Sequence, residues 1–566
     1  MNIAAGEKLR FGSSLVFTYG PWGFLNFPNS TSRLNVVLGL VFVSLAVAIA
    51  FYAVFLGLCR VFPTSGAGPL SAVVVIVVST AGLSFSSFFV FCSGAALSIF
   101  YLRGDLEDQV NGWFLPTFAA ISALLLQVKF SEGIALLGIV AIAMVFSKSV
   151  NVRSTILSVM AFVVSFIVAW SIAGQSLRDV VRWLADSMRI ALGFSDAMSY
   201  EIEPNLLSYA LAAASLAILS VAAFRSVQGS SRRIVIGVLL IVAWSMYFAF
   251  KQGFTRHDNH ELAYFALAAV LFTSVSPKRS SPRLAVGVLA SLLVLSMSSW
   301  SVWNPITARD SWKSIAQTVL DPAYQTRTLN DAAARARDVY ALPSAVVEAA
   351  RGKPVAIDPW ETSLVWAYGL DWRPVPIFQT YSAYTEGLDK RNADTVESSP
   401  EDQVFIRSVQ TVSIDGRNPL WESPNYILAL ACNFRPSAGD EKWVALTKVP
   451  DQCGRSVDSS TLHLRANEVA MVPEAESDEI VVARFVPDSE PIGLKLIQAV
   501  IKDYSPFMVT ADGIEYRLPE GLSNGPLVVG LPGGTGLTSG ADLGIGYRNL
   551  AFSEPGNLLF ETISLD

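Results

Sequence analysis

The sequence predicts a mainly α-helical transmembrane bundle of about ten helices, followed by an exported α/β domain with a β-rich C-terminal tail. Up to about residue 301, apolar runs alternate with short polar links, whereas charges, prolines and glycines are spread through the rest. A helix needs about 20 apolar residues to cross a hydrocarbon core of roughly 30 Å. We therefore expect four parts: an outer N-terminal segment (1–33), a polytopic transmembrane domain (34–301), an exported α/β domain (302–425) and an exported β-rich region (426–566).

Ten apolar runs have the composition of membrane spans, although several are short for this task. They cover residues 34–58, 70–85, 87–102, 113–128, 133–146, 154–172, 206–223, 234–250, 262–275 and 284–300. Connectors with Arg or Lys alternate with connectors that lack this enrichment, and short cytoplasmic loops carry the excess of basic residues. We therefore expect a multi-pass protein of a bacterial plasma membrane, with the N-terminal segment, the connectors 174–204 and 251–261, and the C-terminal domain outside.

The exported part begins with helical patterns, then alternates short strands with helices, and from residue 426 becomes rich in short strands. Its two cysteines, Cys432 and Cys453, are predicted to form a disulfide because this bond persists outside the cytoplasm. The glycine-rich run 530–546 lacks the Gly-Lys-Ser/Thr of a phosphate loop, so it predicts a surface loop. No block of basic residues indicates nucleic acid as a partner.

The stretch 251–261 (KQGFTRHDNHE) places both signs of charge and two of the three histidines between two apolar runs. Such groups at a membrane boundary are typical of a site for an anionic headgroup, a metal ion or a proton, and also occur in a solvated loop. The charged candidates in this stretch are the cations Lys251 and Arg256 and the carboxylates Asp258 and Glu261. His257 and His260 would contact substrate or, with Asp258, hold a divalent cation, the one cofactor that the chain suggests.

Two further polar positions accompany the apolar runs. Lys129, with Glu132, interrupts a run; a lysine there either snorkels to headgroups or neutralises a phosphate near the membrane surface. In the segment 10–25, Tyr19 and Trp22 stand beside a Gly-Pro turn. They predict either an interfacial aromatic belt or a cavity wall that contacts a sugar or lipid chain.

The stretch 358–394 combines large aromatic residues with hydrogen-bonding side chains. This pattern is typical of a carbohydrate-binding surface, and a hydrophobic core with polar edges gives a similar string. The predicted substrate-binding residues are Trp360, Arg373, Gln379, Tyr381, Tyr384 and Asn392.

The strings FTYGPWGFL, KFSEG, GFSDAMS, KQGFTRHDNHE and FQTYSAYTEGLDKRNAD together resemble a group of bacterial membrane proteins related to the GT-C glycosyltransferases. The resemblance touches both halves of the chain, and its motifs do not define one substrate. It implies a polytopic enzyme that moves a sugar from a polyprenyl-phosphate donor to a cell-envelope glycan or lipid acceptor on the outer face. An acidic residue of the first outer loop then serves as the base or positions the acceptor. Asp258 or Glu261 would be the base if that loop does not supply it, and Lys129, Lys251 and Arg256 would bind the leaving phosphate.

One departure from the group concerns that acidic loop. In the group, an Asp-containing stretch and a first helix precede the FTYGP-like segment, whereas Glu7 is the one acidic residue here before the first apolar run. We therefore expect either that the short N-terminal tail crosses the membrane unaided, or that an upstream helix is missing from the chain. Two other functions stay open at this point: a transporter or flippase of a lipid-linked sugar, and a non-catalytic glycan-binding or assembly protein.

Overall fold

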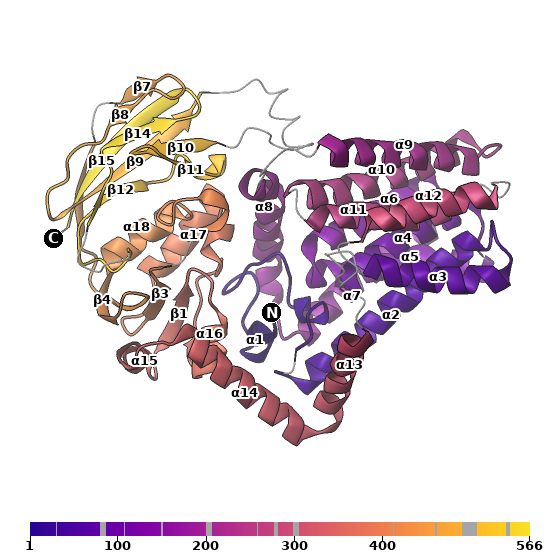
Figure 1. Cartoon of the computed structure of the whole chain (residues 1–566), viewed down its shortest axis with the longest axis horizontal. Coiled ribbons are helices and arrows are strands. Elements are labelled where there is room, and N and C mark those ends of the chain that lie inside the picture. Colours follow the sequence, from indigo (N-terminus) through magenta and orange to yellow (C-terminus); the bar gives the residue numbers. More distant parts are fainter. Residues whose placement is uncertain are drawn as a thin grey trace. The chain divides into compact units, whose positions relative to one another are not determined.

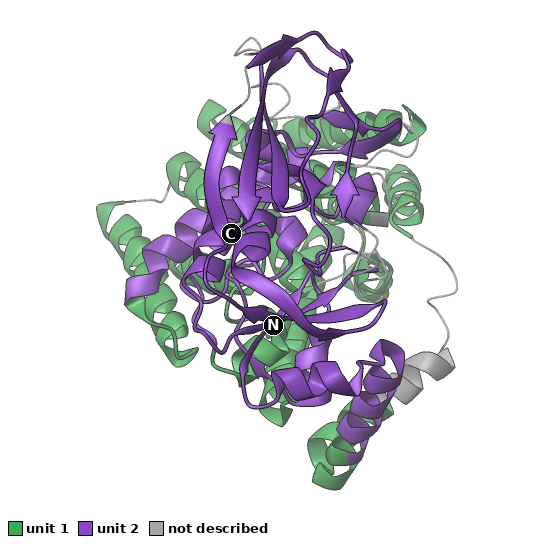
Figure 2. Ribbon diagram, turned by 90° about the vertical axis from the view of Figure 1, so that its left-hand side faces the viewer, with its two compact units in different colours: residues 1–8, 18–177, 200–326 green, residues 9–17, 178–199, 327–566 purple. Residues whose placement is uncertain are grey.

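A computed structural model describes most of the chain, which folds into two compact units (Figures 1 and 2). The helical unit comprises residues 1–8, 18–177 and 200–326, and the C-terminal unit comprises residues 9–17, 178–199 and 327–566. The described residues are 1–29, 31–79, 86–106, 108–148, 151–199, 206–256, 259–276, 281–297, 305–410, 413–458, 461–488, 507–538 and 544–565.

Each of the ten predicted apolar runs overlaps an apolar helix of the helical unit. Five of the described helices are long and apolar enough to cross a membrane: α2 (Arg33–Leu58), α4 (Ser86–Arg103), α7 (Val152–Ile172), α9 (Leu206–Ser226) and α10 (Arg232–Phe254). Shorter apolar stretches lie in α3 (Thr64–Ser79), α6 (Phe130–Phe146), α11 (Leu262–Val275), α12 (Pro282–Leu295) and residues 112–128 of α5 (Asp108–Val128). The five long helices indicate a multi-pass membrane protein and confirm the coarse fold prediction for this region.

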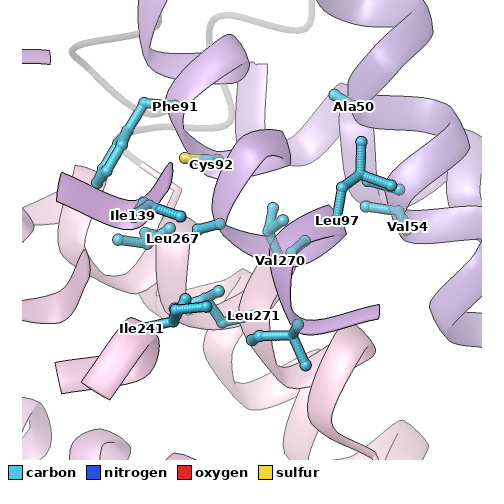
Figure 3. Close-up of a cluster of buried hydrophobic side chains, with 14 of the residues drawn as sticks. Ala50, Val54, Phe91, Cys92, Leu97, Ile139, Ile241, Leu267, Val270 and Leu271 are labelled. Carbon is cyan, nitrogen blue, oxygen red and sulfur yellow. The ribbon is translucent and has the colours of Figure 1, made fainter. Parts of the chain in front are cut away.

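The helices of this unit differ in how much protein surrounds them. The apolar window of α4 is 94% buried, whereas that of α7 is 17% buried. A helix that is apolar on all sides needs either protein or lipid around it. Helix α4 is therefore central, with Phe91, Cys92 and Leu97 in the same buried cluster as Ile139, Leu267 and Val270 (Figure 3). The exposed apolar side chains of α7 have the composition that hydrocarbon requires.

The remaining elements of the helical unit are short or lie outside the apolar runs. Helix α1 (Asn2–Gly6) and the short 3₁₀ helix η1 (Gly23–Leu25) flank the N-terminal segment, η3 (Asn259–Glu261) precedes α11, and α13 (Pro305–Leu320) follows α12. Helix α14 (Pro322–Tyr340) continues the chain into the C-terminal unit.

The C-terminal unit contains a mixed five-stranded sheet in the order β2-β1-β3-β5-β4. Strands β1 (Pro354–Asp358) and β3 (Val404–Ser408) are parallel, β2 (Asp371–Trp372) is parallel to β1, and β5 (Trp443–Lys448) is antiparallel to both β3 and β4 (Phe434–Gly439). The helices of this part are α15 (Ser344–Ala350), α16 (Ser363–Tyr368), α17 (Glu386–Glu397) and α18 (Pro424–Asn433), with 3₁₀ turns η5 (Thr380–Ser382) and η6 (Ile414–Gly416). Position 426, the expected start of the β-rich region, lies inside α18, and β4 and β5 complete this first sheet.

Two antiparallel sheets follow, so the predicted mixed α/β part with β-sheet after it is confirmed. One has the order β11-β10-β14-β8, and the other has the order β13-β12-β9-β15-β6, with β7 paired to β15. Their strands are β6 (Cys453–Asp458), β7 (Leu462–Leu464), β8 (Ala470–Met471), β9 (Glu479–Pro487), β10 (Met508–Ala511), β11 (Ile514–Arg517), β12 (Leu527–Leu531), β13 (Ile545–Gly546), β14 (Asn549–Phe552) and β15 (Gly556–Leu565), and η7 (Glu520–Leu522) precedes β12. A disulfide joins Cys432 at the end of α18 to Cys453 at the start of β6, as predicted from the sequence, and is consistent with an extracytoplasmic location.

Helix α8 (Val180–Met198), which follows the 3₁₀ turn η2 (Leu177–Asp179), belongs to the C-terminal unit. It lies in the connector 174–204, between two of the apolar runs. Its inner face is anchored by buried Trp183 and by Asp186, whose carboxylate pairs with Arg391 and with Arg189. Val181 on the other face is exposed, so the two faces have different surroundings.

Candidate functional site

A buried ion pair lies where α5 passes into α6. Lys129 has an extended backbone between the two helices, and its Nζ atom lies 2.6 Å from Oε1 of Glu132, one helical turn later. Both residues are buried, with relative exposures of 8% and 2%. No hydrogen bond from a described residue reaches the other carboxylate oxygen, Oε2, although this atom is buried. A buried charge requires a partner, so this pair fixes a polar point inside an apolar unit.

The N-terminal segment docks on the same helix break. The backbone N–H of Trp22 donates to the carbonyl of Gln127 (3.0 Å), and that of Phe130 donates to the carbonyl of Thr18 (3.2 Å). A Cβ atom added to Gly20 would lie 2.5 Å from the Gln127 carbonyl oxygen, so the close approach requires glycine. The last carbonyls of α5 and the first N–H groups of α6 have no partner within their own helices, and these two bonds supply one to each helix.

Two predicted aromatic residues are positioned by this docking. Lys129 Nζ lies 5.9 Å from the centroid of the Tyr19 ring, and the Trp22 indole N–H donates to the carbonyl of Ala169 (2.9 Å). Burial, and next the negative charge of Glu132, raise the pKa of the Tyr19 phenol. The sequence offered Lys129 as one motif and Tyr19 with Trp22 as another. The structure brings the two motifs together at the break between α5 and α6.

The second polar group of the helical unit lies at the end of α10. Lys251 is half-buried, Glu261 accepts a hydrogen bond from the Ser208 hydroxyl, and a Cβ added to Gly253 would lie 3.0 Å from the Glu261 Cα. The end of α10 that carries Lys251 therefore packs on Glu261 through Gly253. His260 and Arg256 are also partly buried. His257 and Asp258 lie outside the described residues, and so does the metal site predicted from them with His260.

The packing of α6 against α10 shows at which end of the helical unit Lys129 and Lys251 each lie. The indole N–H of Trp244 donates to the carbonyl of Ala135 (2.9 Å), and Gly237 packs on Phe146. The two helices therefore run in opposite directions. At 1.5 Å per residue, the chain from Trp244 to Lys251 covers about 10 Å along α10. This distance brings Lys251 level with the first turn of α6. Lys129 and Lys251 consequently belong to the same end of the helical unit.

The aromatic stretch of the C-terminal unit divides into a packed part and an accessible part. The Tyr384 hydroxyl donates to the carbonyl of Ile190 (2.6 Å) in the core, and the Asn392 amide bonds both backbone groups of Ile377 (2.9 and 3.0 Å). These two residues were predicted to bind substrate, but their polar groups serve the fold. Arg373 is exposed and pairs with Asp371 (3.2 Å).

The accessible part opens on a pocket. Trp360 lines a cavity of about 170 Å³ and meets Tyr381 edge to face at 5.5 Å, and the Tyr381 hydroxyl donates to Gln379 (2.9 Å). The lining residues that the structure describes all belong to the C-terminal unit. The lining adds residues that the sequence analysis missed, including Arg407, Asn418, Glu422, Tyr426, Tyr516 and Tyr547.

An ion pair at the ends of two parallel strands forms part of this site. Asp358, the last residue of β1, is fully buried and pairs with Arg407 near the end of β3. Arg407 Nε also donates to the carbonyl of Leu537 (3.3 Å). Ligands of α/β sheets bind outside the carboxyl ends of the strands, because loops diverge there. The pocket occupies this edge.

Two ionisable groups beside the pair have shifted pKa values. Burial raises the pKa of Glu422 to about 7, although the hydrogen bond that its Oε1 accepts from the Ile414 N–H (3.0 Å) opposes the shift. Burial, and next the Asp358 carboxylate, raise the pKa of Tyr426 well above its ordinary value. Glu422 therefore titrates near neutral pH and can donate as well as accept a hydrogen bond.

One group of potential metal ligands gathers within the described part of the chain. Cys432, Asp451 and Cys453 bring their ligand atoms within 4.8 Å of one another. The two sulfur atoms form the disulfide, so they are not thiolate ligands. The divalent cation expected near His260 stays a prediction.

In comparisons with known proteins, no family model, no curated protein and no solved structure matches this chain.

Proposed function

We propose that this chain is an integral membrane glycosyltransferase that moves a sugar from a polyprenyl-phosphate donor to a cell-envelope glycan or lipid acceptor on the outer face. The observation that carries the proposal is the gathering of Lys129, Lys251 and Glu261 at one end of the helical unit. Cations and a carboxylate at that end match the two demands of the reaction, a leaving phosphate and an acceptor proton.

Each residue type has a defined task in an inverting transfer. The carboxylate of Glu261 or Asp258 takes the proton of the acceptor hydroxyl, whose oxygen forms a bond to the anomeric carbon of the sugar. The bond from that carbon to the phosphate oxygen breaks, and polyprenyl phosphate leaves with the electron pair. Lys251 and Arg256 stabilise the negative charge that develops on this phosphate. Lys129, whose charge Glu132 partly neutralises, adds a weaker contribution. Tyr19 and Trp22 supply apolar surface for the sugar or the lipid chain.

Support also comes from the low-dielectric surroundings of these groups. Lys129 is almost fully buried, and a charge interaction at a buried site is screened much less than one in water. The docked N-terminal segment holds Tyr19 beside Lys129, so the arrangement is formed before any substrate binds. Preorganised charge is the main way in which enzymes stabilise a developing anion.

The proposal is tested by transfer in proteoliposomes, with undecaprenyl-phosphate glucose and mannose as donors and an envelope extract as the source of acceptors. Release of undecaprenyl phosphate is measured. Glu261→Gln is expected to lower turnover about a hundredfold if Glu261 is the base, with Asp258→Asn as the companion variant. Glu7→Gln is the matched control, because Glu7 is exposed. Absence of release by the wild-type chain, or equal release by all four proteins, would refute the proposal.

A further inference from the structure

We infer that the cavity at the carboxyl edge of the five-stranded sheet is a binding site for one neutral sugar ring. This site is separate from the transfer chemistry proposed for the helical unit, and all of its described lining residues come from the C-terminal unit.

The size of the cavity limits the ligand. The cavity has a volume of about 170 Å³. Pockets for drug-sized ligands occupy about 300–1,000 Å³. A single pyranose ring is therefore a suitable occupant, and an oligosaccharide would have to place its other rings outside.

The lining supplies the two surfaces that a sugar requires. Aromatic rings of Trp360, Tyr426, Tyr516 and Tyr547 form apolar walls that can face the C–H groups of the ring. Between them, Ser408, Asn418 and Glu422 supply polar atoms for hydroxyl groups. The Asn418 amide donates to the Tyr547 hydroxyl (2.7 Å), which fixes the position of both side chains before a ligand arrives.

The charge of the cavity selects a neutral ligand. Arg407 is already paired with Asp358 and bonded to the Leu537 carbonyl, so its charge is compensated within the protein. Glu422, the one carboxyl among the described lining residues, interacts with the buried Arg417 guanidinium as well as with Arg407, so the charges around the cavity balance. A phosphate or a nucleotide would therefore find no uncompensated cation here, whereas a neutral polyol needs none.

Glu422 gives this site a polar group with both donor and acceptor capacity. Its Oε1 accepts from the Ile414 N–H, and no hydrogen bond within the described part of the chain engages Oε2. A protonated carboxyl donates one hydrogen bond and still accepts others, which suits a sugar hydroxyl. The residue also lies beside Trp421, whose indole N–H donates to the Val528 carbonyl (2.8 Å) and fixes this turn.

The experiment uses the full chain in lipid nanodiscs and three probes: the methyl glucopyranoside, mannopyranoside and galactopyranoside. Binding is measured by calorimetry, with glucose 6-phosphate and AMP as anionic comparisons. At least one hexoside is expected to bind, and neither anion is expected to bind more tightly. Trp360→Ala should weaken hexoside binding about tenfold, which is about 1.4 kcal/mol. Trp366→Ala is the matched control, because this partly buried tryptophan of the same stretch does not line the cavity.

Glu422→Gln keeps the acceptor for the Ile414 N–H and is a second variant in case Trp360→Ala fails to fold. It should remove the dependence of hexoside affinity on pH around 7. The inference would be overturned if the folded wild-type chain bound none of the three hexosides, or bound an anion more tightly. Equal affinity of Trp360→Ala and Trp366→Ala for a hexoside would also overturn it. Binding of undecaprenyl phosphate, measured in parallel, reports on the helical unit, so failure here is distinguishable from failure of the proposed transfer function.

Discussion

The two units each contain a buried ion pair, and the pairs differ in how the fold brings them together. Lys129 and Glu132 are one helical turn apart, so the start of α6 alone makes them neighbours. Asp358 and Arg407 are 49 residues apart and meet because β1 and β3 lie side by side. The local pair marks a point on one element, whereas the distant pair depends on the whole sheet and shapes a cavity. Disruption of the sheet should therefore separate Asp358 from Arg407, whereas Lys129 and Glu132 stay neighbours as long as the start of α6 is helical.

The largest effect is expected for Arg407→Met. This change leaves the Asp358 carboxylate buried without its cation, which costs about 3–5 kcal/mol of the free energy of unfolding. Asp358→Leu combined with Arg407→Met should recover much of this loss, because no uncompensated charge remains. Thermal unfolding of the C-terminal unit, followed by near-UV circular dichroism, measures both. If the single variant is as stable as wild type, the pair does not hold the sheet edge.

The disulfide offers the next largest effect. Cys432→Ser should lower the free energy of unfolding by about 3 kcal/mol, because the bond closes a loop of about 20 residues in the unfolded chain. Cys92→Ser is the matched control, since Cys92 is a free buried cysteine of the helical unit. Denaturant unfolding of the C-terminal unit is the measurement, and equal loss in both variants would speak against a specific role of the bond.

The pH dependence of the C-terminal unit should report on Glu422. Its pKa rises from 4.5 to about 7 on folding, so the folded state binds more protons between these two values. Stability from this group is fully present below pH 4.5 and is lost as the pH rises through 7. At about 1.4 kcal/mol per pKa unit, the loss reaches at most about 3 kcal/mol. Unfolding measured from pH 5 to 8 should show this decrease in the wild type, and a similar decrease in Glu422→Gln would assign it to another group.

A smaller effect is expected from Gly20→Ala in the helical unit. The added Cβ meets backbone atoms of Gln127 and forces the N-terminal segment away from the helix break, at a cost of about 1–3 kcal/mol. Gly6→Ala is the control, because a Cβ there meets nothing within 4 Å. Thermal unfolding of the purified chain compares the two. A stable Gly20→Ala variant would show that the segment tolerates displacement.

The sequence predicted the helical unit better than the C-terminal pocket for a physical reason. Apolar run length is a local property, so the ten runs were found, and the charges at their ends were visible beside them. The walls of the pocket come from positions as far apart as Pro359 and Tyr547. One signal for the distant pair was present, since Arg407 interrupts the apolar strand VFIRS directly before its end. The partner of this arginine could not be deduced without the order of the strands.

The stretch 358–394 shows the same limit inside one segment. Aromatic density indicated a surface for sugars, but it could not separate Trp360, which lines the cavity, from Tyr384, which is buried. In the segment 375–378, the side-chain amide of Asn392 takes the place of a strand partner for Ile377. Such side-chain substitutes for backbone pairing have no signature in hydrophobic periodicity.

The most direct test of the proposed function is the affinity of the full chain for undecaprenyl phosphate in detergent, which requires neither the sugar nor the acceptor to be known. Lys251→Ala should weaken binding roughly ten- to a hundredfold, because a charge-assisted contact is worth about 1.5–3 kcal/mol. Lys148→Ala removes an exposed lysine at the opposite end of α6 and should leave affinity unchanged. Equal affinities in the wild type and both variants would contradict a donor phosphate site at the Lys129–Lys251 end of the helical unit.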